Sequence, residues 1–158
     1  MSKFISLLVM VFSIQALADV PVHTDRNEAE YSDQYAVVLN GYDPVSYFSE
    51  GGGAPLMGTT AITFTYGSKM YYFANVENQE KFKKNPLKYE PSYGSWCAYA
   101  MSQGSRVHIN PLFYTINNNR LHFFVSRSAK RTFDRDVEGH ELEADRHWFS
   151  FSGEQPRK

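Results

Sequence analysis

Two pairs of short apolar segments, each joined by a tight turn, constrain the fold of this chain more than any other feature of its sequence. Residues 60–66 and 70–73 flank Gly67-Ser68, whereas residues 113–116 and 121–125 flank three consecutive asparagines. Alternation of polar and apolar residues predicts half-buried strands, and Gly and Asn are frequent in the turns between antiparallel strands. The sequence therefore predicts two β-hairpins.

Helical segments are expected on either side of these hairpins. Asn75 is a suitable N-cap for a helix over 76–84, which ends before Asn85-Pro86. Apolar residues of the C-terminal third recur at helical spacing on two faces, which Gly139 separates. Hairpins mixed with helices indicate an α+β fold, an antiparallel sheet built from hairpins with helices packed on it. The first of the two apolar faces consists of Ala129, Phe133 and Val137, and the second of Leu142, Ala144 and Trp148. Four further segments are expected: a strand over 35–39, a helical turn over 45–48 after Asp43-Pro44, a connector over 87–93 and a helix over 96–101.

The first 18 residues have the features of a secretory signal peptide. Lys3 provides a positive start, residues 4–12 are largely apolar, and Ala16-Leu17-Ala18 fits a cleavage site. We expect a mature chain that begins at Asp19 and is periplasmic or secreted, with an uncleaved membrane anchor as the alternative. The expected organisation is a signal peptide at 1–18, an N-terminal arm at 19–34, one domain at 35–150 and a polar tail at 151–158 that is frayed from Gly153 onward.

The charge balance of the chain argues against polyanionic partners. Removal of Lys3 with the signal peptide reduces the 16 Lys and Arg residues to 15, against 17 Asp and Glu residues, a net charge of −2. Proteins that bind nucleic acids or anionic membranes usually present a basic face. The sequence therefore predicts neither nucleic-acid binding nor stable membrane insertion after cleavage, and it does not identify a protein partner.

Short motifs follow one another in a fixed order along about residues 35–149. They are Gly41-Tyr42-Asp43-Pro44-Val45-Ser46-Tyr47-Phe48, the hairpin Tyr66 to Phe73, Asn78 and Phe82, Pro86-Leu87-Lys88-Tyr89, Pro91-Ser92-Tyr93-Gly94-Ser95-Trp96-Cys97-Ala98-Tyr99-Ala100, Asn110-Pro111, Ile116, Leu121 and Ala144-Asp145-x-x-Trp148. As an ordered set, these motifs resemble the exported, single-domain members of the YHS-domain family. Short members of that family accompany heavy-metal transport proteins, so the resemblance implies metal handling and no particular activity.

One departure from the pattern of the exported members concerns the backbone at Ser95. Those members read Tyr-Gly-Gly before an aromatic residue and Cys, whereas this chain reads Tyr93-Gly94-Ser95-Trp96-Cys97. If the second glycine has a left-handed backbone, Ser95 must adopt that backbone at some cost. The three residues that give the family its name form no contiguous motif here, so no role is assigned from them.

Cys97 is the only cysteine of the chain, which therefore cannot form an internal disulfide. Such a thiol is buried and inert, functional, or paired with another molecule. On a helix Cys97 and Met101 lie one turn apart, and His108 follows after a short loop. A Cys, Met and His set suits Cu(I), so these residues are the candidate metal site and copper is the candidate cofactor. The alternative is that Cys97 and Met101 belong to a face of the core.

A second set of metal-ligating residues is expected in the C-terminal helical region. His140 and His147 are seven residues apart with Glu143 between them, so the three side chains share one helical face. A harder metal suits this set, although a solvated helix face is the simpler interpretation. His23 and His122 are expected in the arm and in a strand, without a ligand role.

An enzymatic function would make Cys97 a nucleophile. A cysteine nucleophile requires a histidine base, for which His108 and His122 are the candidates. It also requires an electropositive setting, and Arg106 is the only nearby residue that could provide one. No motif of a known cysteine hydrolase surrounds Cys97. An enzyme is therefore the less favoured interpretation.

A third class of function is a non-catalytic interaction module. The chain has 11 Tyr and 12 Phe residues, and tyrosine combines an apolar ring with a polar hydroxyl that suits binding surfaces. Several rings in one cleft would bind a small molecule or a protein, whereas rings packed singly would belong to the core. The tyrosines considered for such a cleft are Tyr31, Tyr35, Tyr42, Tyr47, Tyr89, Tyr93 and Tyr99.

Overall fold

The computed structural model describes residues 25–157, so the expected signal peptide and the start of the expected arm lie outside the described residues. Within this range, strands and helices alternate with short 3-10 helices. The strands are β1 (Thr59–Tyr66), β2 (Lys69–Phe73), β3 (Asn110–Asn117) and β4 (Arg120–Phe124). The helices are α1 (Val76–Lys84), α2 (Pro86–Tyr89), α3 (Ala98–Ser102), α4 (Arg127–Phe133) and α5 (Val137–Ser152), with 3-10 helices η1 (Glu28–Glu30), η2 (Val38–Gly41), η3 (Ser49–Gly51) and η4 (Ser92–Ser95).

Both predicted hairpins are present and confirm the α+β class. β1 pairs with β2 and β3 pairs with β4, each in antiparallel orientation, as two separate two-stranded sheets. In the β3–β4 turn, Asn118 and Asn119 have φ angles of 48° and 62°. A two-residue hairpin turn requires such angles, and asparagine adopts them more readily than most residues. The local sequence therefore determines this hairpin.

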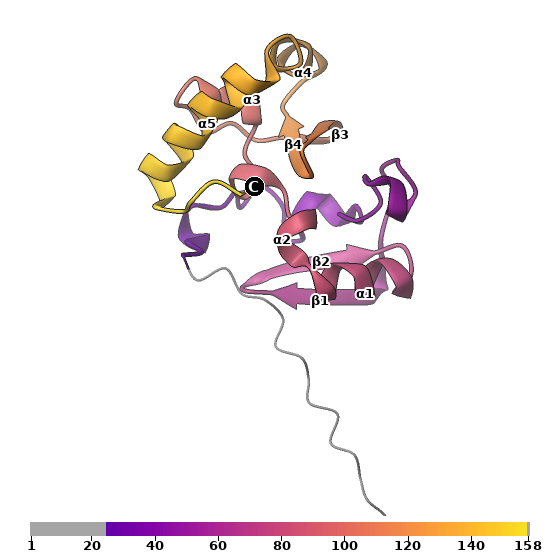
Figure 1. The fold of residues 1–158 in the computed structure, drawn as a ribbon. Helices are drawn as coiled ribbons and strands as arrows, with labels where there is room; N and C mark the ends of the chain where they lie inside the picture. Colours follow the sequence, from indigo (N-terminus) through magenta and orange to yellow (C-terminus); the bar gives the residue numbers. More distant parts are fainter. Residues whose placement is uncertain (1–24, 158) are drawn as a thin grey trace, which may run out of the picture.

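The two hairpins lie in different parts of the molecule, each with its own helices (Figure 1). α1 packs against β1 and β2, whereas α3, α4 and α5 gather around β3 and β4. Segments from both ends of the described chain run between these two groups (Figure 1). The middle of the molecule is thus built from residues far apart in the sequence.

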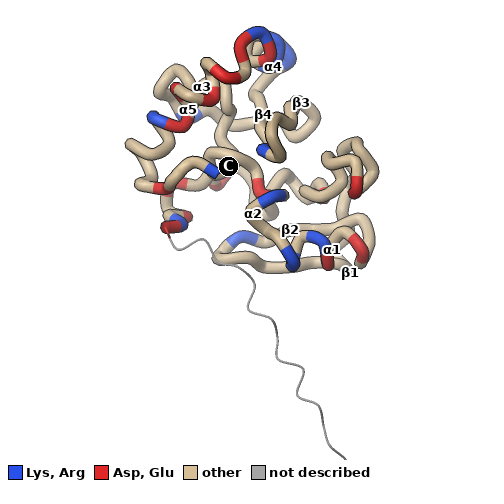
Figure 2. The backbone as a smooth tube through the Cα atoms, viewed as in Figure 1, with Lys and Arg blue, Asp and Glu red and all other residues tan. Residues whose placement is uncertain are grey.

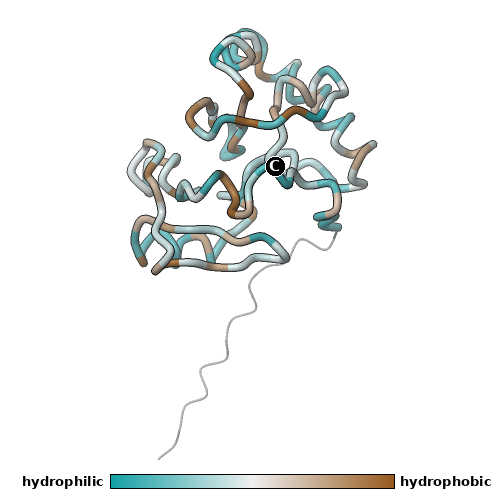
Figure 3. The backbone as a smooth tube through the Cα atoms, turned by 180° about the vertical axis from the view of Figure 1, so that it is seen from behind, coloured by the Kyte–Doolittle hydropathy of each residue, from teal (hydrophilic) through white to brown (hydrophobic). Residues whose placement is uncertain are grey.

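Aromatic rings fill the core of each group. Phe82 of α1 is fully buried, and its ring centroid lies 4.6 Å from that of Tyr71 and 5.4 Å from that of Phe73. Beside β4, the rings of Phe124 and Phe133 are 5.1 Å apart. Hydrophobic and hydrophilic residues alternate along the chain instead of forming long blocks (Figure 3). Because the only cysteine is free, this apolar packing stabilises the fold without a disulfide.

Side-chain caps define where three of the helices begin. At the start of α1, the Asn75 side chain accepts a hydrogen bond of 2.8 Å from the backbone N–H of Asn78, and the predicted bounds 76–84 are confirmed. Ser126 and Asp136 cap α4 and α5 in the same way. These helix starts are therefore fixed by hydrogen bonds between near neighbours in the sequence.

The expected strand over residues 35–39 is wrong. Val38–Gly41 instead forms the 3-10 helix η2, in which Leu39 and Asn40 have left-handed backbone angles. The Leu39 side chain is 1% exposed, although this segment pairs with no neighbouring strand among residues 25–157. Burial of one apolar side chain in the core, and not strand pairing, fixes this segment.

Three further boundaries differ from the expectation. The helical turn expected over 45–48 is a series of hydrogen-bonded turns around the buried Asp43. The connector expected over 87–93 includes most of α2 and the start of η4. The helix expected over 96–101 begins at Ala98, with Cys97 as its N-cap residue. Each difference follows from backbone hydrogen bonds that residue type alone does not specify.

The C-terminal helices divide before Gly139, which lies in the first turn of α5. Ala144 and Trp148 are buried as expected, but Leu142 is 61% exposed, so the expected second apolar face is wrong at this position. The neighbouring Glu141 is buried instead and contacts His122 of β4. On this side of α5, the residue that faces the interior is therefore the polar Glu141 and not Leu142.

The tail is not frayed within the described residues. Glu154 is 2% exposed and accepts hydrogen bonds from the Asn27 backbone N–H at 2.6 Å and from the Tyr31 hydroxyl and Trp148 indole N–H, both at 3.2 Å. Three donors compensate the burial of this carboxylate. The tail is therefore held against the start of the described chain.

Acidic and basic residues are interspersed along the backbone (Figure 2). This distribution matches the near-balance of charges in the sequence. Across residues 25–157, no helix combines the length and the apolar character that crossing a membrane requires.

Candidate functional site

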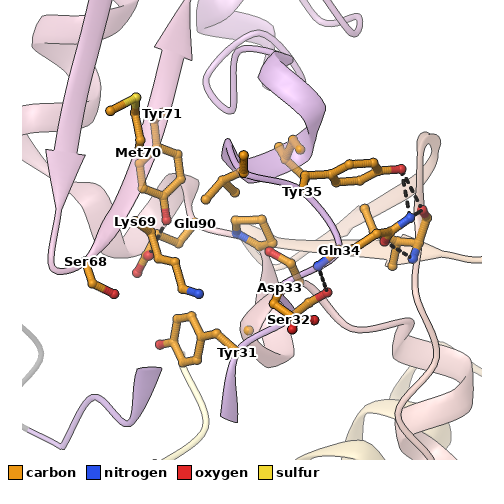
Figure 4. Close-up of a pocket in the computed structure, with 17 residues that line it drawn as sticks. Tyr31, Ser32, Asp33, Gln34, Tyr35, Ser68, Lys69, Met70, Tyr71 and Glu90 are labelled. Atoms are coloured by element: carbon orange, nitrogen blue, oxygen red, sulfur yellow. Dashed lines mark hydrogen bonds between the residues drawn. The ribbon is translucent and has the colours of Figure 1, made fainter. Parts of the chain in front are cut away.

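A cavity of about 260 Å³ lies where the N-terminal segment, the start of β2 and the 90–95 segment meet (Figure 4). Its aromatic lining consists of Tyr31 and Tyr35 from the N-terminal segment and Tyr71 from β2. We call it the tyrosine cavity. Because its walls come from three separate segments, the cavity exists only in the folded chain.

Hydrogen bonds hold the N-terminal wall of the tyrosine cavity in place. The Gln34 side chain donates to the Ile109 carbonyl oxygen at 2.9 Å and accepts from the Ile109 N–H at 2.8 Å. The same amide donates to the Tyr35 hydroxyl at 2.8 Å. Figure 4 shows these contacts at one end of the cavity. This wall is thus attached to the backbone beside β3.

The carboxylate of Glu90 forms part of the wall of the tyrosine cavity and is buried, with Glu90 2% exposed. Its two oxygens accept hydrogen bonds from the Tyr71 hydroxyl and from Arg26 Nη1, both at 2.6 Å. Burial raises the pKa of Tyr71 well above its ordinary value, so the hydroxyl stays protonated and keeps donating. Glu90 and Tyr71 therefore satisfy each other and form a rigid part of the wall.

Two charged side chains of the tyrosine cavity remain open to a ligand. Among residues 25–157, neither the Lys69 ammonium nor the Asp33 carboxylate makes a hydrogen bond or an ion pair with another side chain. Figure 4 shows the Lys69 side chain extending between Tyr31 and Asp33. The cavity thus offers one positive group and one negative group next to aromatic rings.

The turn behind the cavity has a left-handed backbone at three consecutive residues. Tyr93, Gly94 and Ser95 have φ angles of 56°, 57° and 69°. A Cβ at Gly94 would lie 2.9 Å from the rings of Tyr31 and Trp148, so glycine is required there. Ser95 adopts the left-handed backbone that was expected for the second glycine of the resembled pattern. Its side chain costs about 1–2 kcal/mol in that conformation.

The structure places the three candidate copper ligands in two different environments. Cys97 and Met101 are fully buried and one turn apart, and the Met101 N–H donates to the Cys97 carbonyl oxygen at 2.8 Å. His108 is exposed, stacks on Trp96 with ring centroids 5.1 Å apart, and has Nδ1 3.3 Å from Ser32 Oγ. The two sulfur residues are therefore neighbours, whereas the histidine ring lies on the outside.

The second predicted metal set is used for packing and surface contacts. His140 stacks on Phe133, His147 stacks on Phe151, and Glu143 pairs with Arg146 at 3.0 Å. In the part of the chain that the structure describes, no three His, Cys, Asp or Glu side chains are arranged to hold a metal ion. These side chains therefore have partners within the fold.

The seven tyrosines considered from the sequence do not share one cleft. Tyr31 and Tyr35 line the tyrosine cavity, and the third ring there, Tyr71, was not among them. The alternation of residues 69–73 places Tyr71 on the buried face of β2, which is the signal that could have identified it. The other rings pack elsewhere: Tyr42 packs against the hydrophobic core, Tyr47 contacts Phe123, Tyr89 contacts Phe48, Tyr93 contacts His122 and Tyr99 contacts His140.

A buried pair of titratable residues was also missed. His122 Nε2 lies 2.6 Å from Glu141 Oε1, and His122 is fully buried. Burial lowers the pKa of His122. Burial alone would raise the pKa of Glu141, but the hydrogen bonds from His122 and Asn117 outweigh it and leave that pKa below its ordinary value. Nineteen residues separate the partners, so no local motif indicates the pair.

Comparisons with known proteins add no further assignment. No protein-family model matches the chain, and neither a curated protein nor a solved structure matches it. The candidate site is therefore defined by its own geometry.

Proposed function

We propose that this chain is a non-catalytic binding protein for a small zwitterionic aromatic molecule, of the class of free aromatic amino acids. The observation that carries this proposal is the tyrosine cavity, in which Lys69 and Asp33 have no side-chain partner among the described residues. A ligand carboxylate would pair with the Lys69 ammonium, and a ligand ammonium would pair with Asp33. The tyrosine rings would contact its apolar part.

The polar groups deepest in the tyrosine cavity favour binding over chemistry. The Tyr71 hydroxyl is held protonated by burial and donates to Glu90, which also receives Arg26. Proton transfer to a substrate would have to break the buried hydrogen bonds that Glu90 accepts from Tyr71 and Arg26. These groups instead keep the wall rigid, so that little entropy is lost when a ligand binds.

The location of the protein is a further part of the proposal. The signal-peptide features of residues 1–18 support an exported protein, periplasmic or secreted, and the ordered motifs support a YHS-like domain. An exported binder meets free small molecules outside the cytoplasm. Soft-metal binding is a second candidate, supported by the two buried sulfur residues one helical turn apart.

A panel of three related probes tests the binding proposal. Phenylalanine carries both charges, phenylacetate carries only the carboxylate, and phenethylamine carries only the ammonium. At pH 7, calorimetric titration of the mature protein should give the tightest binding for phenylalanine. Lys69→Met should weaken phenylalanine binding by about tenfold or more, because one charge-assisted hydrogen bond contributes roughly 1.5–3 kcal/mol.

Two variants complete the test. Asp33→Asn should remove the advantage of phenylalanine over phenylacetate and leave phenylacetate binding unchanged. Lys84→Met removes the same charge from an exposed lysine of α1 that does not line the tyrosine cavity, and it should bind all three probes like the wild type. Equal binding of phenylalanine by the Lys69 and Lys84 variants would show that the proposal is wrong.

A further inference from the structure

A second cavity, of about 350 Å³, lies next to α2, the β3–β4 turn and the C-terminal tail. Its lining includes three cationic side chains, Lys88, Arg120 and Arg157, and one acidic side chain, Glu90. We call it the basic cavity. It shares the Glu90 wall with the tyrosine cavity, but Lys69 and Asp33 do not line it. Cations therefore outnumber carboxylates in the lining, although each of them also pairs with a carboxylate, Lys88 with Glu50, Arg120 with Asp145 and Arg157 with Glu90.

Arg120 gives the basic cavity a buried donor without a partner. Its side chain is 10% exposed, and its guanidinium contacts Asp145 at 2.5 Å and the Tyr93 hydroxyl at 3.0 Å. The Nε–H is buried and has no hydrogen-bond partner among residues 25–157. A buried donor left unsatisfied costs about 1–3 kcal/mol. The Nε–H has almost no exposed surface, so a ligand oxygen would recover this cost only if the Arg120 side chain turned toward the basic cavity.

Arg157 is held beside this donor by the backbone of the 90–95 segment. Its Nη1 donates to the carbonyl oxygens of Glu90 at 3.3 Å and Pro91 at 3.2 Å. Its Nη2 lies 3.5 Å from Glu90 Oε2, which already receives Arg26. One carboxylate thus serves two guanidinium groups, and the positive charge of this wall is only partly neutralised.

Lys88 provides the third cation from α2. Its ammonium pairs with Glu50, and the Lys88 side chain is 29% exposed. The hydrogen bond from Lys88 lowers the pKa of Glu50 to about 2, so a ligand anion would share the ammonium with this carboxylate and would not displace it. The side chains of Asn85 and Asn119 add neutral donors around the same space.

From this arrangement we propose that the basic cavity binds a small molecule through a phosphoryl group. A phosphoryl group carries up to two negative charges and three acceptor oxygens, which match the two guanidinium groups and the ammonium. Free pyrophosphate and a phosphorylated organic molecule offer the same chemistry. This site does not depend on the proposed function of the tyrosine cavity.

Titration at constant ionic strength tests the site, with pyrophosphate and glucose 6-phosphate as probes. Calorimetry of the mature wild-type protein should show saturable binding of one probe molecule per chain. Lys88→Met should weaken that binding by about tenfold, since the loss of one charged contact corresponds to roughly 1.5 kcal/mol. Tighter binding of glucose 6-phosphate would identify a phosphorylated organic molecule as the natural class, and tighter binding of pyrophosphate would identify the free anion.

Matched variants separate this site from general electrostatic attraction. Lys84→Met removes the same charge outside the basic cavity and should leave the binding of both probes unchanged. Arg157→Met, with its fold checked by circular dichroism, should weaken binding like Lys88→Met. The absence of saturable binding of both probes overturns the proposal, as does equal binding by the Lys88 and Lys84 variants.

Discussion

Ser95 is a single residue at which the sequence and the backbone are in conflict. It has φ 69° in a turn whose other left-handed positions are Tyr93 and Gly94, and a side chain is disfavoured there. The Ser95 side chain lines the tyrosine cavity, so this strained turn forms part of the candidate site. Strain of this kind persists only where the surrounding structure holds the backbone in place.

We expect Ser95→Gly to stabilise the protein. Relief of the left-handed strain gains about 1–2 kcal/mol, and the greater chain entropy of glycine in the unfolded state offsets roughly 0.5–1 kcal/mol of it. Urea denaturation should therefore show an increase of about 0.5 kcal/mol in the free energy of unfolding. Ser105→Gly, at an exposed loop residue without a positive φ, should show no increase. A destabilised Ser95→Gly variant would contradict the strain argument.

Cys97 presents a second question at the residue scale. If copper binds through the two buried sulfur residues, Cu(I) titration against a competing chelator should give one equivalent for the wild type. Cys97→Ser should abolish this binding and Met101→Leu should weaken it, whereas His108→Ala should leave it unchanged because that ring lies outside on Trp96. Undiminished binding in Cys97→Ser would end the copper hypothesis.

A buried polar pair joins β4 to α5, beside the ion pair of Arg120 with Asp145. His122 and Glu141 join these elements at 2.6 Å, and Asn117 of β3 donates to the same Glu141 oxygen at 3.1 Å. A neutral imidazole donating from Nε2 to the carboxylate avoids a buried unpaired charge, and His122 Nδ1 has no hydrogen-bond partner among residues 25–157. With Glu141 turned inward, the neighbouring Leu142 lies on the exposed side of α5.

The pair makes stability dependent on pH. Because the folded-state pKa values of both residues are lowered, the unfolded chain binds more protons in acid. Stability is therefore fully present above the ordinary pKa of histidine, 6.5. It falls as pH decreases through the ordinary pKa values of His122 and then Glu141. The melting temperature of the wild type should decrease steadily from pH 7 to pH 4.

Glu141→Gln isolates the carboxylate in this prediction. At pH 7 the variant should lose about 1–3 kcal/mol of unfolding free energy, the usual contribution of a hydrogen bond to a charged group. The difference from the wild type should shrink only below the ordinary pKa of Glu141, 4.5, as the pH falls toward its lowered folded-state pKa and the wild-type carboxylate becomes neutral. Glu138→Gln, an exposed position in the same helix, should change stability by less than about 1 kcal/mol at pH 7 and at pH 4. A difference that is constant with pH would contradict the pairing.

At the scale of the whole molecule, the sequence predicts what neighbouring residues determine. The two hairpins and α1 follow from alternation, turn residues and the Asn75 cap, all within a few positions of each other. The segment 35–39 is apolar for a different reason, since Leu39 is buried by residues distant in the sequence. A short apolar run looks the same in the sequence whether it forms a strand or buries a side chain of an irregular segment, so the local pattern cannot separate these two cases.

The candidate site depended even more on distant contacts. Tyr71 and Glu90 are 19 residues apart, and Gln34 and Ile109 are 75 residues apart, yet both pairs build walls of the tyrosine cavity. Of the seven tyrosines considered from the sequence, Tyr31 and Tyr35 line this cavity. The sequence did not indicate Lys69 and Asp33 as candidate site residues. They are candidates because they line the cavity without side-chain partners among the described residues, which a sequence does not show.

The contact between the tail and the start of the described chain has a practical consequence. Glu154 holds Asn27 and Tyr31, and Arg157 reaches the Tyr31 hydroxyl at 3.2 Å while lining the basic cavity. An exopeptidase that trimmed five residues from the carboxyl end would remove both side chains without cutting any internal peptide bond. The basic cavity would then lose Arg157 from its lining, and Tyr31 of the tyrosine cavity would lose two hydrogen-bond partners. The intact mass of the purified protein should therefore be verified before any affinity is compared.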